Sequence, residues 1–293
     1  MRTAVHPCPF NTVPYAASLR KIGEVEVDAT GAIPVFRRSI PATDRFDGVG
    51  PWPYLWIDGK ADIEALYTGF RHLVTLGVVT QPGYRPEVEG PDAVLLKQHY
   101  VYDPSLPTPE LSRRARKRLA RCEEAASFDV VADVTERLAI VGLYEAVKLR
   151  HDLAGGFFDH DAAHFEVLAR LADSVFFRVA DDDGTGAMAC GVVFGDVLQI
   201  LHMPSSEAGL RWNASYLLMH GLQDFARQNG LRLMTGGLPA GATDGLRVFK
   251  ERWANDFLPV YLLRIVNDRA RYAELCASSA GDPNFFPSYR RRA

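Results

Sequence analysis

The chain has 293 residues, a hydrophobic fraction of 47%, a charged fraction of 24% and a formal net charge of −3, with a pI near 6.2. This balance is typical of a globular protein and argues against a global affinity for DNA or for acidic membranes. No segment approaches the roughly 20 apolar residues of a membrane span, and the proline-broken start does not resemble a secretory signal. The four cysteines (Cys8, Cys122, Cys190 and Cys276) have no ligand or redox spacing. We therefore expect a cytoplasmic α/β protein with free thiols and no membrane partner.

The first 105 residues are predicted to form an α/β half. Residues 23–38 alternate apolar and polar side chains around Thr30-Gly31, which indicates a hairpin. One helical stripe follows, made of Ile63, Leu66, Tyr67, Phe70, Leu73 and Val74. Residues 92–103 read as a strand and end at a proline-rich linker, where we place a domain boundary.

Residues 106–266 carry the more regular pattern. A basic helix and the strand 127–133 come first, and a further helix begins at Asp133, which has Glu136 three residues later, the acidic counterpart of a capping box. Another helix and three strand-like runs precede a long helix, about 212–229, that ends at Gly230. A strand, a short helix at 244–253 and a final strand complete the order β-α-α-β-β-β-α-β-α-β. Residues 267–293 are left as a C-terminal tail, packed through Tyr289 or wrapped around a partner.

The basic helix presents one broad charged face, with Leu111, Ala115, Leu119 and Cys122 behind it. Its basic residues are Arg113, Arg114, Arg116, Lys117, Arg118 and Arg121. One interpretation is a solvated surface. The other is a docking site for tRNA phosphates or for an acidic carrier protein, since counterion release favours such patches even at negative net charge.

Several histidines are candidates for chemistry. His151 and Arg150 end a helix, where positive charge is favoured in any case, but His151 is also a candidate base. His202 ends a strand on the predicted face of Leu198 and Ile200 and is either a core residue or a base. His160 and His164 flank a helix start beside Asp161, but without a convincing third ligand we expect no metal.

Lys250 lies on the flank of a stripe formed by Leu246, Phe249 and Trp253 in the short helix 244–253. The lysine either extends along the apolar surface to reach water or faces an anionic group.

The element order resembles the GNAT acyltransferase superfamily, and four segments resemble its Fem-like branch of aminoacyl and peptidyl transferases. They are "ELSRRARKRLARCEEAASFDV", "LYEAVKLRHD", "ASYLLMHGLQDFARQNGLRLMTGG" and "DGLRVFKERWANDFLPVYLLRI". The resemblance implies a GNAT fold, with a mixed, mostly antiparallel central sheet flanked by helices, over residues 106–266. The N-terminal half would be a partial or degenerate copy of that fold.

The resemblance also implies an N-acyltransferase that forms an amide with the amine of a small-molecule or peptide-like acceptor, in secondary metabolism or cell-wall-type chemistry. No tightly bound cofactor is expected. The segment "PSSEAGLRWNASYLL" lacks the glycine-rich pyrophosphate loop of acyl-CoA enzymes. A carrier-protein phosphopantetheine thioester or an aminoacyl-tRNA is therefore favoured as the donor over free CoA. The alternatives are an acyl-CoA N-acetyltransferase and a catalytically inactive binding module.

The residues implied for the site fall into two groups. The catalytic candidates are His202, His151 and Lys250, the last placed by the Phe-Lys motif near the negative charge of the donor. The donor-binding candidates are Arg150, Asn213, Ser215, Tyr216, Arg247, Phe249 and Lys250.

Overall fold

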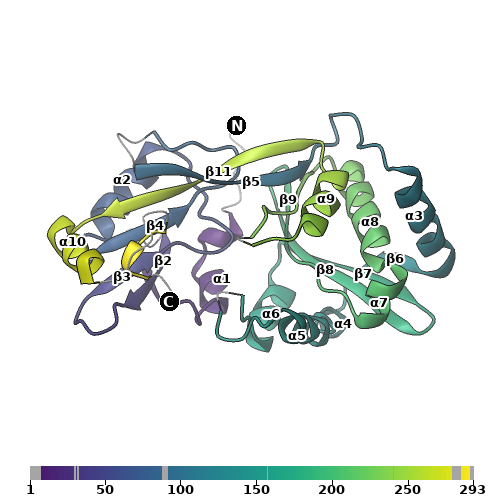
Figure 1. The fold of residues 1–293 in the computed structure, drawn as a ribbon, viewed down its shortest axis with the longest axis horizontal. Coiled ribbons are helices and arrows are strands. Elements are labelled where there is room, and N and C mark those ends of the chain that lie inside the picture. Colours follow the sequence, from purple (N-terminus) through teal and green to yellow (C-terminus); the bar gives the residue numbers. More distant parts are fainter. Residues whose placement is uncertain are drawn as a thin grey trace. The chain divides into compact units, whose positions relative to one another are not determined.

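A computed structural model describes most of the chain. The described residues are 8–29, 31, 33–87, 92–156, 158–239, 241–278 and 285–290. Thr30 of the predicted hairpin turn lies outside the described residues. So do the first seven residues, on which the expectation of no secretory signal partly rests. The chain forms two compact units, unit 1 over 98–258 and unit 2 over 8–97 and 259–290 (Figure 1). None of the described helices has the length and apolar character to cross a bilayer.

The sheet of unit 1 has the order β5-β10-β9-β8-β7-β6. Its strands are β5 (Ala93–Tyr102), β6 (Ser127–Val130), β7 (Ser174–Asp181), β8 (Gly184–Phe194), β9 (Val197–His202) and β10 (Arg232–Met234). All neighbours pair antiparallel except β9 and β10, which are parallel. The predicted mostly antiparallel sheet with flanking helices is confirmed.

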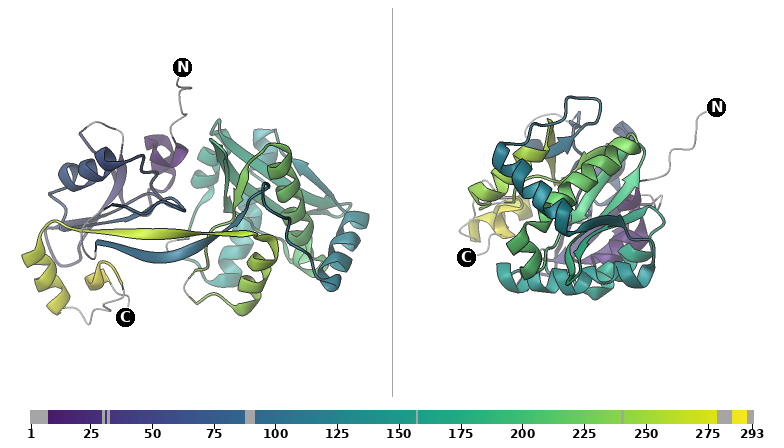
Figure 2. Two further views of the ribbon diagram at one scale, coloured as in Figure 1. Left: turned by 90° about the horizontal axis from the view of Figure 1, so that it is seen from above. Right: turned by 90° about the vertical axis from the view of Figure 1, so that its right-hand side faces the viewer.

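Helices cover both faces of this sheet (Figures 1 and 2). They are α3 (Arg113–Ala125), α4 (Val134–Arg137), α5 (Ile140–His151), α6 (Ala162–Arg170), α7 (Glu207–Trp212), α8 (Ala214–Gln228) and α9 (Asp244–Trp253). One face carries α8, which contacts the sheet and supports α3. The other face carries α5 and α6, which pack on β8 and β7. The sequence predicted one helix where α4 and α5 are separate.

Two helices of unit 1 form as their sequences dictate. In α3 the buried side chains are Ala115, Leu119 and Cys122, as the charge pattern predicted. The end of α8 has the two hydrogen bonds of a Schellman motif, because Gly230 adopts a φ of 64°. The start of α8 differs from the prediction, since Asn213, with a φ of 68°, separates it from the additional helix α7.

Unit 2 has the strand order β1-β2-β3-β4-β11. Its strands are β1 (Glu24–Val27), β2 (Pro34–Ser39), β3 (Phe46–Val49), β4 (Thr75–Val79) and β11 (Asp256–Val266). Its helices are η1 (Pro9–Asn11), α1 (Val13–Ser18), α2 (Lys60–Gly69), α10 (Arg269–Ser278) and η3 (Ser288–Arg290). The hairpin β1–β2 is antiparallel, as predicted. The predicted helical stripe runs past the end of α2, because the chain turns after Phe70 to start β4.

The chain crosses between the units within two strands. Residues up to Lys97 of β5 belong to unit 2 and those from Gln98 belong to unit 1, and the chain returns after Leu258 of β11. The predicted boundary at 105 lies just after β5.

The tail of unit 2 is tied to a buried carboxylate. Asp47 is fully buried and accepts hydrogen bonds from Arg38 (3.0 Å), Arg290 (2.6 Å) and the hydroxyl of Tyr289 (3.1 Å). Tyr289 also bonds Thr75 at 2.9 Å. Of the two interpretations of the tail, the packed one, with Tyr289 as the anchor, holds for the described residues 285–290. We call these five residues the Asp47 network.

Candidate active site

The two parallel strands of unit 1 separate after three residues. Residues 197–199 of β9 pair with 232–234 of β10, and β9 then continues to His202 without β10. The chain after β10 instead follows β5, because Thr235 donates to the carbonyl of Tyr100 and Gly236 accepts from its amide. Gln199 is buried where the strands part, and its Nε2 donates to the carbonyls of Ile200 (2.8 Å) and Met234 (3.2 Å). These hydrogen bonds of Gln199 fix the point at which β9 and β10 separate and an opening between them begins.

A β-bulge lies in β9 just beyond this point. Cys190 of β8 is opposite His202, and the next residue, Gly191, is opposite Ile200, so Leu201 is the extra residue. Bulges reverse the alternation of side chains. Ile200 lies in the core beneath α8, whereas the His202 ring contacts residues of α5 and α6. The prediction that His202 shares a face with Leu198 and Ile200 is therefore wrong, because strict alternation assumes a strand without a bulge.

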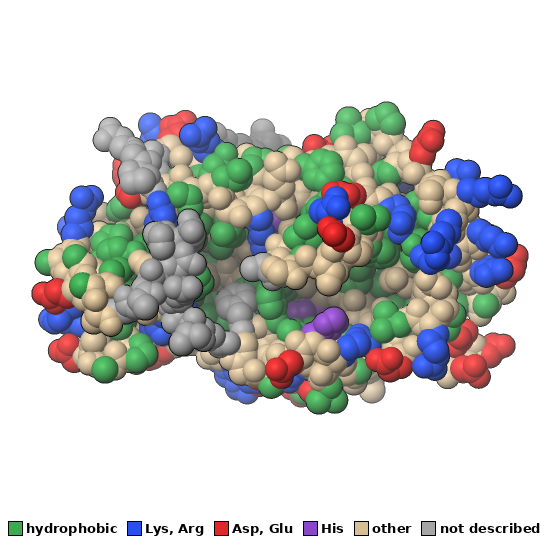
Figure 3. Space-filling view, in the orientation of Figure 1, with side chains coloured by type: hydrophobic (Ala, Val, Ile, Leu, Met, Phe, Trp, Pro, Cys, Tyr) green, Lys and Arg blue, Asp and Glu red, His purple; other side chains and the backbone are tan. Residues whose placement is uncertain are grey.

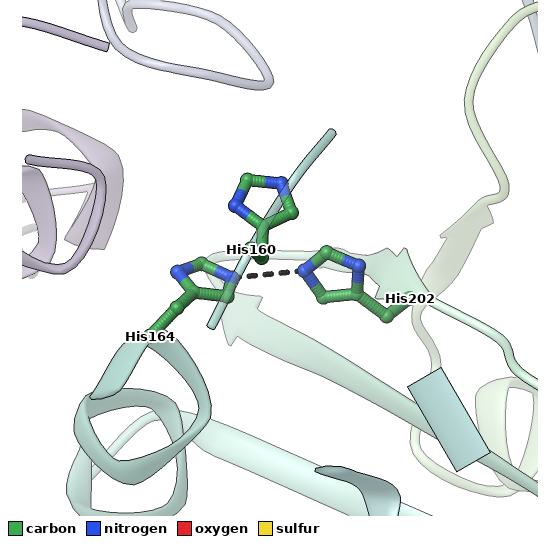
Figure 4. A group of neighbouring side chains, drawn as sticks. All are labelled: His160, His164 and His202. Carbon is green, nitrogen blue, oxygen red and sulfur yellow. Dashed lines mark hydrogen bonds between the residues drawn. The ribbon is translucent and has the colours of Figure 1, made fainter. Parts of the chain in front are cut away.

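Because the bulge reverses its side-chain direction, His202 lies beside two other histidines (Figure 4). Its Nε2 lies 2.9 Å from Nε2 of His164, and the His160 ring stacks on His164 with centroids 4.3 Å apart. One ring nitrogen from each residue lies within 4.8 Å of the other two. All three are buried, with exposed fractions of 5% for His160 and His202 and 1% for His164. We call them the histidine cluster.

Helix α5 and the helix cap Asp161 fix the positions of His160 and His164. Asp161 caps α6 by accepting from the amide of His164 (3.2 Å), which sets His160 and His164 one turn apart at the helix start. Lys148 of α5 donates to the carbonyl of His160 (3.3 Å) and pairs with Asp159 at 2.8 Å. The sequence placed His160 and His164 at one helix start beside Asp161; in the structure Asp161 caps the helix, and a third imidazole comes from β9.

Aromatic rings enclose the cluster. Tyr144 and Phe165 each have ring centroids 5.0 Å from that of His202. The hydroxyl of Tyr144 donates to the carbonyl of Phe158 at 2.7 Å, so it also braces the loop before α6. Burial, and then the neighbouring rings of His164 and His160, lower the pKa of His202 well below its usual value. At neutral pH His202 is therefore a neutral imidazole.

Lys250 lies on the β10 side of the opening. Its ammonium donates to the carbonyl of Thr235, directly after β10, and lies 5.9 Å from the ring centroid of Tyr100. In α9, Trp253 is buried and Phe249 is partly buried against the core, so Lys250 is on the flank of an apolar stripe, as predicted. Its role toward a donor stays a prediction.

The end of α5 does not join the cluster. Arg150 pairs with Glu207 of α7 at 2.7 Å and donates to the carbonyl of Ser205 at 3.4 Å. His151 is exposed. It lies seven residues beyond Tyr144, the α5 residue that contacts His202, which is about 10 Å along a helix.

The other predicted donor residues, except Arg247, gather around the start of α8. Ser215 is half-buried in its first turn, and Asn213 precedes it. The hydroxyl of Tyr216 accepts from Arg118 (3.0 Å) and Arg252 (2.5 Å). The ring of Tyr216 contacts Phe249, with centroids 5.9 Å apart. Arg247 is exposed and pairs with Asp244 and Glu251 on its own helix. Arg118 thus points toward Tyr216, unlike the other basic residues of α3.

Helix α7 occupies the position of the predicted missing loop. It packs against β8 at a glycine pair, where a β-carbon added to Gly209 would lie 1.9 Å from the carbonyl oxygen of Gly186. The indole of Trp212 lies over the same strand, 2.1 Å from a β-carbon that would be added to Gly186. The segment before α8 is therefore a docked helix capped by Ser206, whose side chain accepts from the amide of Gly209.

Comparison with known proteins places this architecture. No family model and no curated protein matches the sequence. Among solved structures, FemX is similar over 92% of this chain and 95% of its own, with a TM-score of 0.63 and 10% identity. The fold is Fem-like. L-PGS from Bacillus licheniformis is similar over 92% of this chain and 95% of its own, with a TM-score of 0.57 and 15% identity. The C-terminal domain of a putative lysylphosphatidylglycerol synthetase from Agrobacterium fabrum is similar over 90% of this chain and 89% of its own, with a TM-score of 0.59 and 15% identity.

The structural likeness to FemX confirms the Fem-like fold that the sequence resemblance implied for residues 106–266, and the likeness extends over 92% of the chain. The sequence did not identify Gln199 or Tyr144 as residues of the site. Gln199 was one polar residue inside an apolar run, which was the available signal. Tyr144 lies in the quoted segment "LYEAVKLRHD", and nothing in that segment indicates the histidines that it faces.

Proposed function

We propose that unit 1 is an N-acyltransferase that moves an acyl or aminoacyl group from a carrier-bound donor to an amine. The opening between β9 and β10 on a Fem-like fold is the observation that carries this proposal. The amine attacks the donor carbonyl, the new C–N bond forms, and the bond to the carrier oxygen or sulfur breaks. The amine proton leaves, and the carrier departs as an alcohol or thiol.

The bulged end of β9 suits the stabilisation of the oxyanion. Backbone N–H groups that a bulge directs away from the strand ladder are fixed donors, and such preorganised donors are often the largest electrostatic contribution to acyl transfer. Fixing the amine and the carbonyl together at the opening would supply much of the remaining rate enhancement.

The start of α8 favours a carrier-bound donor over free CoA. A pyrophosphate is usually held by the free backbone amides of a glycine-rich loop at a helix N-terminus. Here α7 occupies that position, and Gly209, its one glycine, packs against β8. A donor attached to a macromolecule obtains its affinity elsewhere on the surface and has less need of such a loop.

The exposed face of α3 supplies a surface of the required charge. Arg113, Arg114, Lys117 and Arg121 are exposed, and Figure 3 shows basic side chains gathered over this helix. We call them the α3 basic face. Among the described residues none of the four forms an ion pair.

The order of charges along α3 opposes the helix dipole. Its first turn has no acidic residue and its last turn has no basic one, although acidic residues are favoured at the start and basic ones at the end. The charges therefore do not stabilise the helix. A loss of helix stability is expected if these charges serve instead to bind the phosphates of tRNA or the acidic surface of a carrier protein.

A donor screen tests the proposal. Purified protein is given an acyl-CoA, an acyl-carrier-protein thioester and an aminoacyl-tRNA, each with a panel of amines, and intact mass spectrometry follows loss of the acyl group. We expect consumption of a carrier-bound donor. Consumption of acyl-CoA at a comparable rate would overturn the carrier assignment. If no donor is consumed, the proposed transfer is wrong and an inactive binding module takes its place.

Two variants connect the activity to the structure. Reversing Arg114, Lys117 and Arg121 to glutamate should raise KM for the carrier and reduce its salt dependence, because three phosphate or carboxylate contacts are lost. The matched control reverses the exposed Arg45 and Lys60 of unit 2 and should leave KM unchanged. Lys250→Ala should lower kcat/KM about tenfold or more, the loss expected for a hydrogen bond to a charged group. A change below about twofold contradicts the role of Lys250.

A further inference from the structure

The histidine cluster has a composition that the transfer reaction does not require. Its three members are all imidazoles, and none of the described carboxylates or thiols joins them within ligand distance. We propose that His160, His164 and His202 together bind one Zn²⁺ ion, a metal-binding role separate from the donor surface of unit 1.

The nitrogen positions are close to those that a bound ion needs. Zn–N bonds of about 2.0–2.1 Å at tetrahedral angles separate the nitrogens by roughly 3.3 Å. The Nε2 atoms of His164 and His202 face each other at 2.9 Å, and the whole set lies within 4.8 Å. An outward shift of a few tenths of an ångström in one pair, and an inward shift of up to about 1.5 Å by the third nitrogen, complete the geometry.

The hydrogen bond between His164 and His202 points to the same arrangement. One Nε2 donates to the other, so both rings direct this nitrogen at a common point. An ion placed there takes the position of the shared proton, which moves to Nδ1 of the ring that carried it, so that both Nε2 atoms bind as neutral ligands. The coordinating nitrogen of each ring must be deprotonated, and only a ring that was an imidazolium releases a proton to solvent on binding.

The neighbouring oxygen and sulfur groups already have structural roles. Asp161 caps α6, and Asp159 pairs with Lys148 and accepts from the amide of Gly155. The buried Cys190 thiol contacts the backbone of His202. Hard ions such as Ca²⁺ and Mg²⁺ prefer oxygen ligands, whereas an all-imidazole set suits Zn²⁺, and Co²⁺ as its spectroscopic substitute.

The surroundings hold the ligands as metal sites usually do. Each histidine is fixed at its backbone, His160 by Lys148, His164 by the capped start of α6 and His202 by its pairing with Cys190. The aromatic rings of Tyr144 and Phe165 keep the cluster apolar, which strengthens metal–ligand interactions. Three protein ligands leave the fourth position for a solvent or substrate oxygen.

Zinc titration of tag-free, chelator-treated protein tests the site. Isothermal titration should give one Zn²⁺ per chain. Separate substitutions His160→Asn, His164→Asn and His202→Asn should each weaken affinity at least about a hundredfold, the upper range for loss of a supporting residue around a metal. The control His220→Asn removes a histidine of α8 that lies 3.6 Å from Glu123 and Asp224, and it should bind as wild type does. Wild-type binding below one equivalent, or equal affinity in all variants, would overturn the proposal.

Cobalt binding to the wild-type protein tests the site without relying on the folding of the variants. Co²⁺ in a tetrahedral site with nitrogen ligands gives intense visible absorption, whereas octahedral surface binding gives only a weak band. We expect the intense spectrum at one equivalent and its loss on adding Zn²⁺. A weak spectrum, or no displacement by Zn²⁺, contradicts the site. Neither measurement requires a transfer substrate, so a failed donor screen leaves this result unaffected.

Discussion

Each unit of the molecule buries a polar cluster, and the two clusters differ in composition. In unit 2 the Asp47 network joins one carboxylate to the guanidinium groups of Arg38 and Arg290 and to the hydroxyl of Tyr289. Opposite charges and matched donors satisfy one another within this cluster. In unit 1 the histidine cluster joins three groups of one kind, and its central contact has two imidazole nitrogens facing each other.

The difference separates a structural cluster from a binding one. Removing one partner from a complementary buried ion pair leaves an uncompensated charge, which is strongly destabilising. A set of identical neutral ligands gains most of its stabilisation when an additional group binds. The Asp47 network should therefore determine stability directly, and the histidine cluster should determine it through linkage to metal.

The largest effect is expected at Asp47. Asp47→Ala leaves Arg38 and Arg290 without their buried acceptor and should lower the free energy of unfolding by about 3–5 kcal/mol. Urea denaturation measures this. The control Asp44→Ala, at a side chain that is 84% exposed, should change it by less than about 0.5 kcal/mol. A loss below about 1 kcal/mol for Asp47→Ala would show that the network is not structural.

Zinc should stabilise the protein through the histidine cluster alone. At a free zinc concentration one hundred times Kd, the free energy of unfolding should rise by about 2.7 kcal/mol, because the ion binds the folded state. Differential scanning calorimetry with and without zinc measures the shift in Tm. His164→Asn should abolish the zinc-dependent shift, while Asp47→Ala should retain it at a lower Tm. A shift of equal size in both variants would contradict the distinction between the two clusters.

The pH dependence of stability should report on Tyr289. Burial, and then the charge of Asp47, raise the pKa of Tyr289 above its ordinary value near 10. Above pH 10 the unfolded chain loses this proton while the folded chain keeps it, so stability falls as pH rises. Tyr289→Phe should make this decline shallower at pH 10 to 11 and leave the slope near pH 7 unchanged. An equal slope in both proteins above pH 10 would exclude Tyr289 as its source.

The smallest expected effect on stability concerns the exposed charges of α3, which belong to neither buried cluster. Arg113→Glu places a negative charge in the first turn and should stabilise the helix by about 0.3–1 kcal/mol. Arg113→Gln should give a smaller gain, since it removes the unfavourable charge without adding a favourable one. Thermal unfolding at low salt measures both. Destabilisation by Arg113→Glu would show that this charge supports the fold and would weaken the argument that it serves docking.

The sequence predicted the elements whose signals are local. Helix α3 has a regular apolar stripe, α8 ends at a glycine cap, and the meander of β7, β8 and β9 has tight turns. Short strands with weak local signals, such as β4 of five residues, were not predicted, because their pairing partners are distant in the sequence.

The candidate site was predictable only in parts. The spacing of His160 and His164 on one helix start is a local property, and the sequence identified that pair. The position of Lys250 on the flank of α9 was also correct for the same reason.

By itself the sequence determined helices such as α3 and α8, the meander, the Fem-like order of elements and the charge of α3, because periodicity and caps act over a few residues. Only the tertiary structure decided that His202 joins His160 and His164. The decision depends on one bulge residue, Leu201, which reverses the side-chain direction at the end of β9. A register shift between strands leaves no regular mark on the pattern of a six-residue segment, so the third imidazole could be placed only once β8 and β9 were paired.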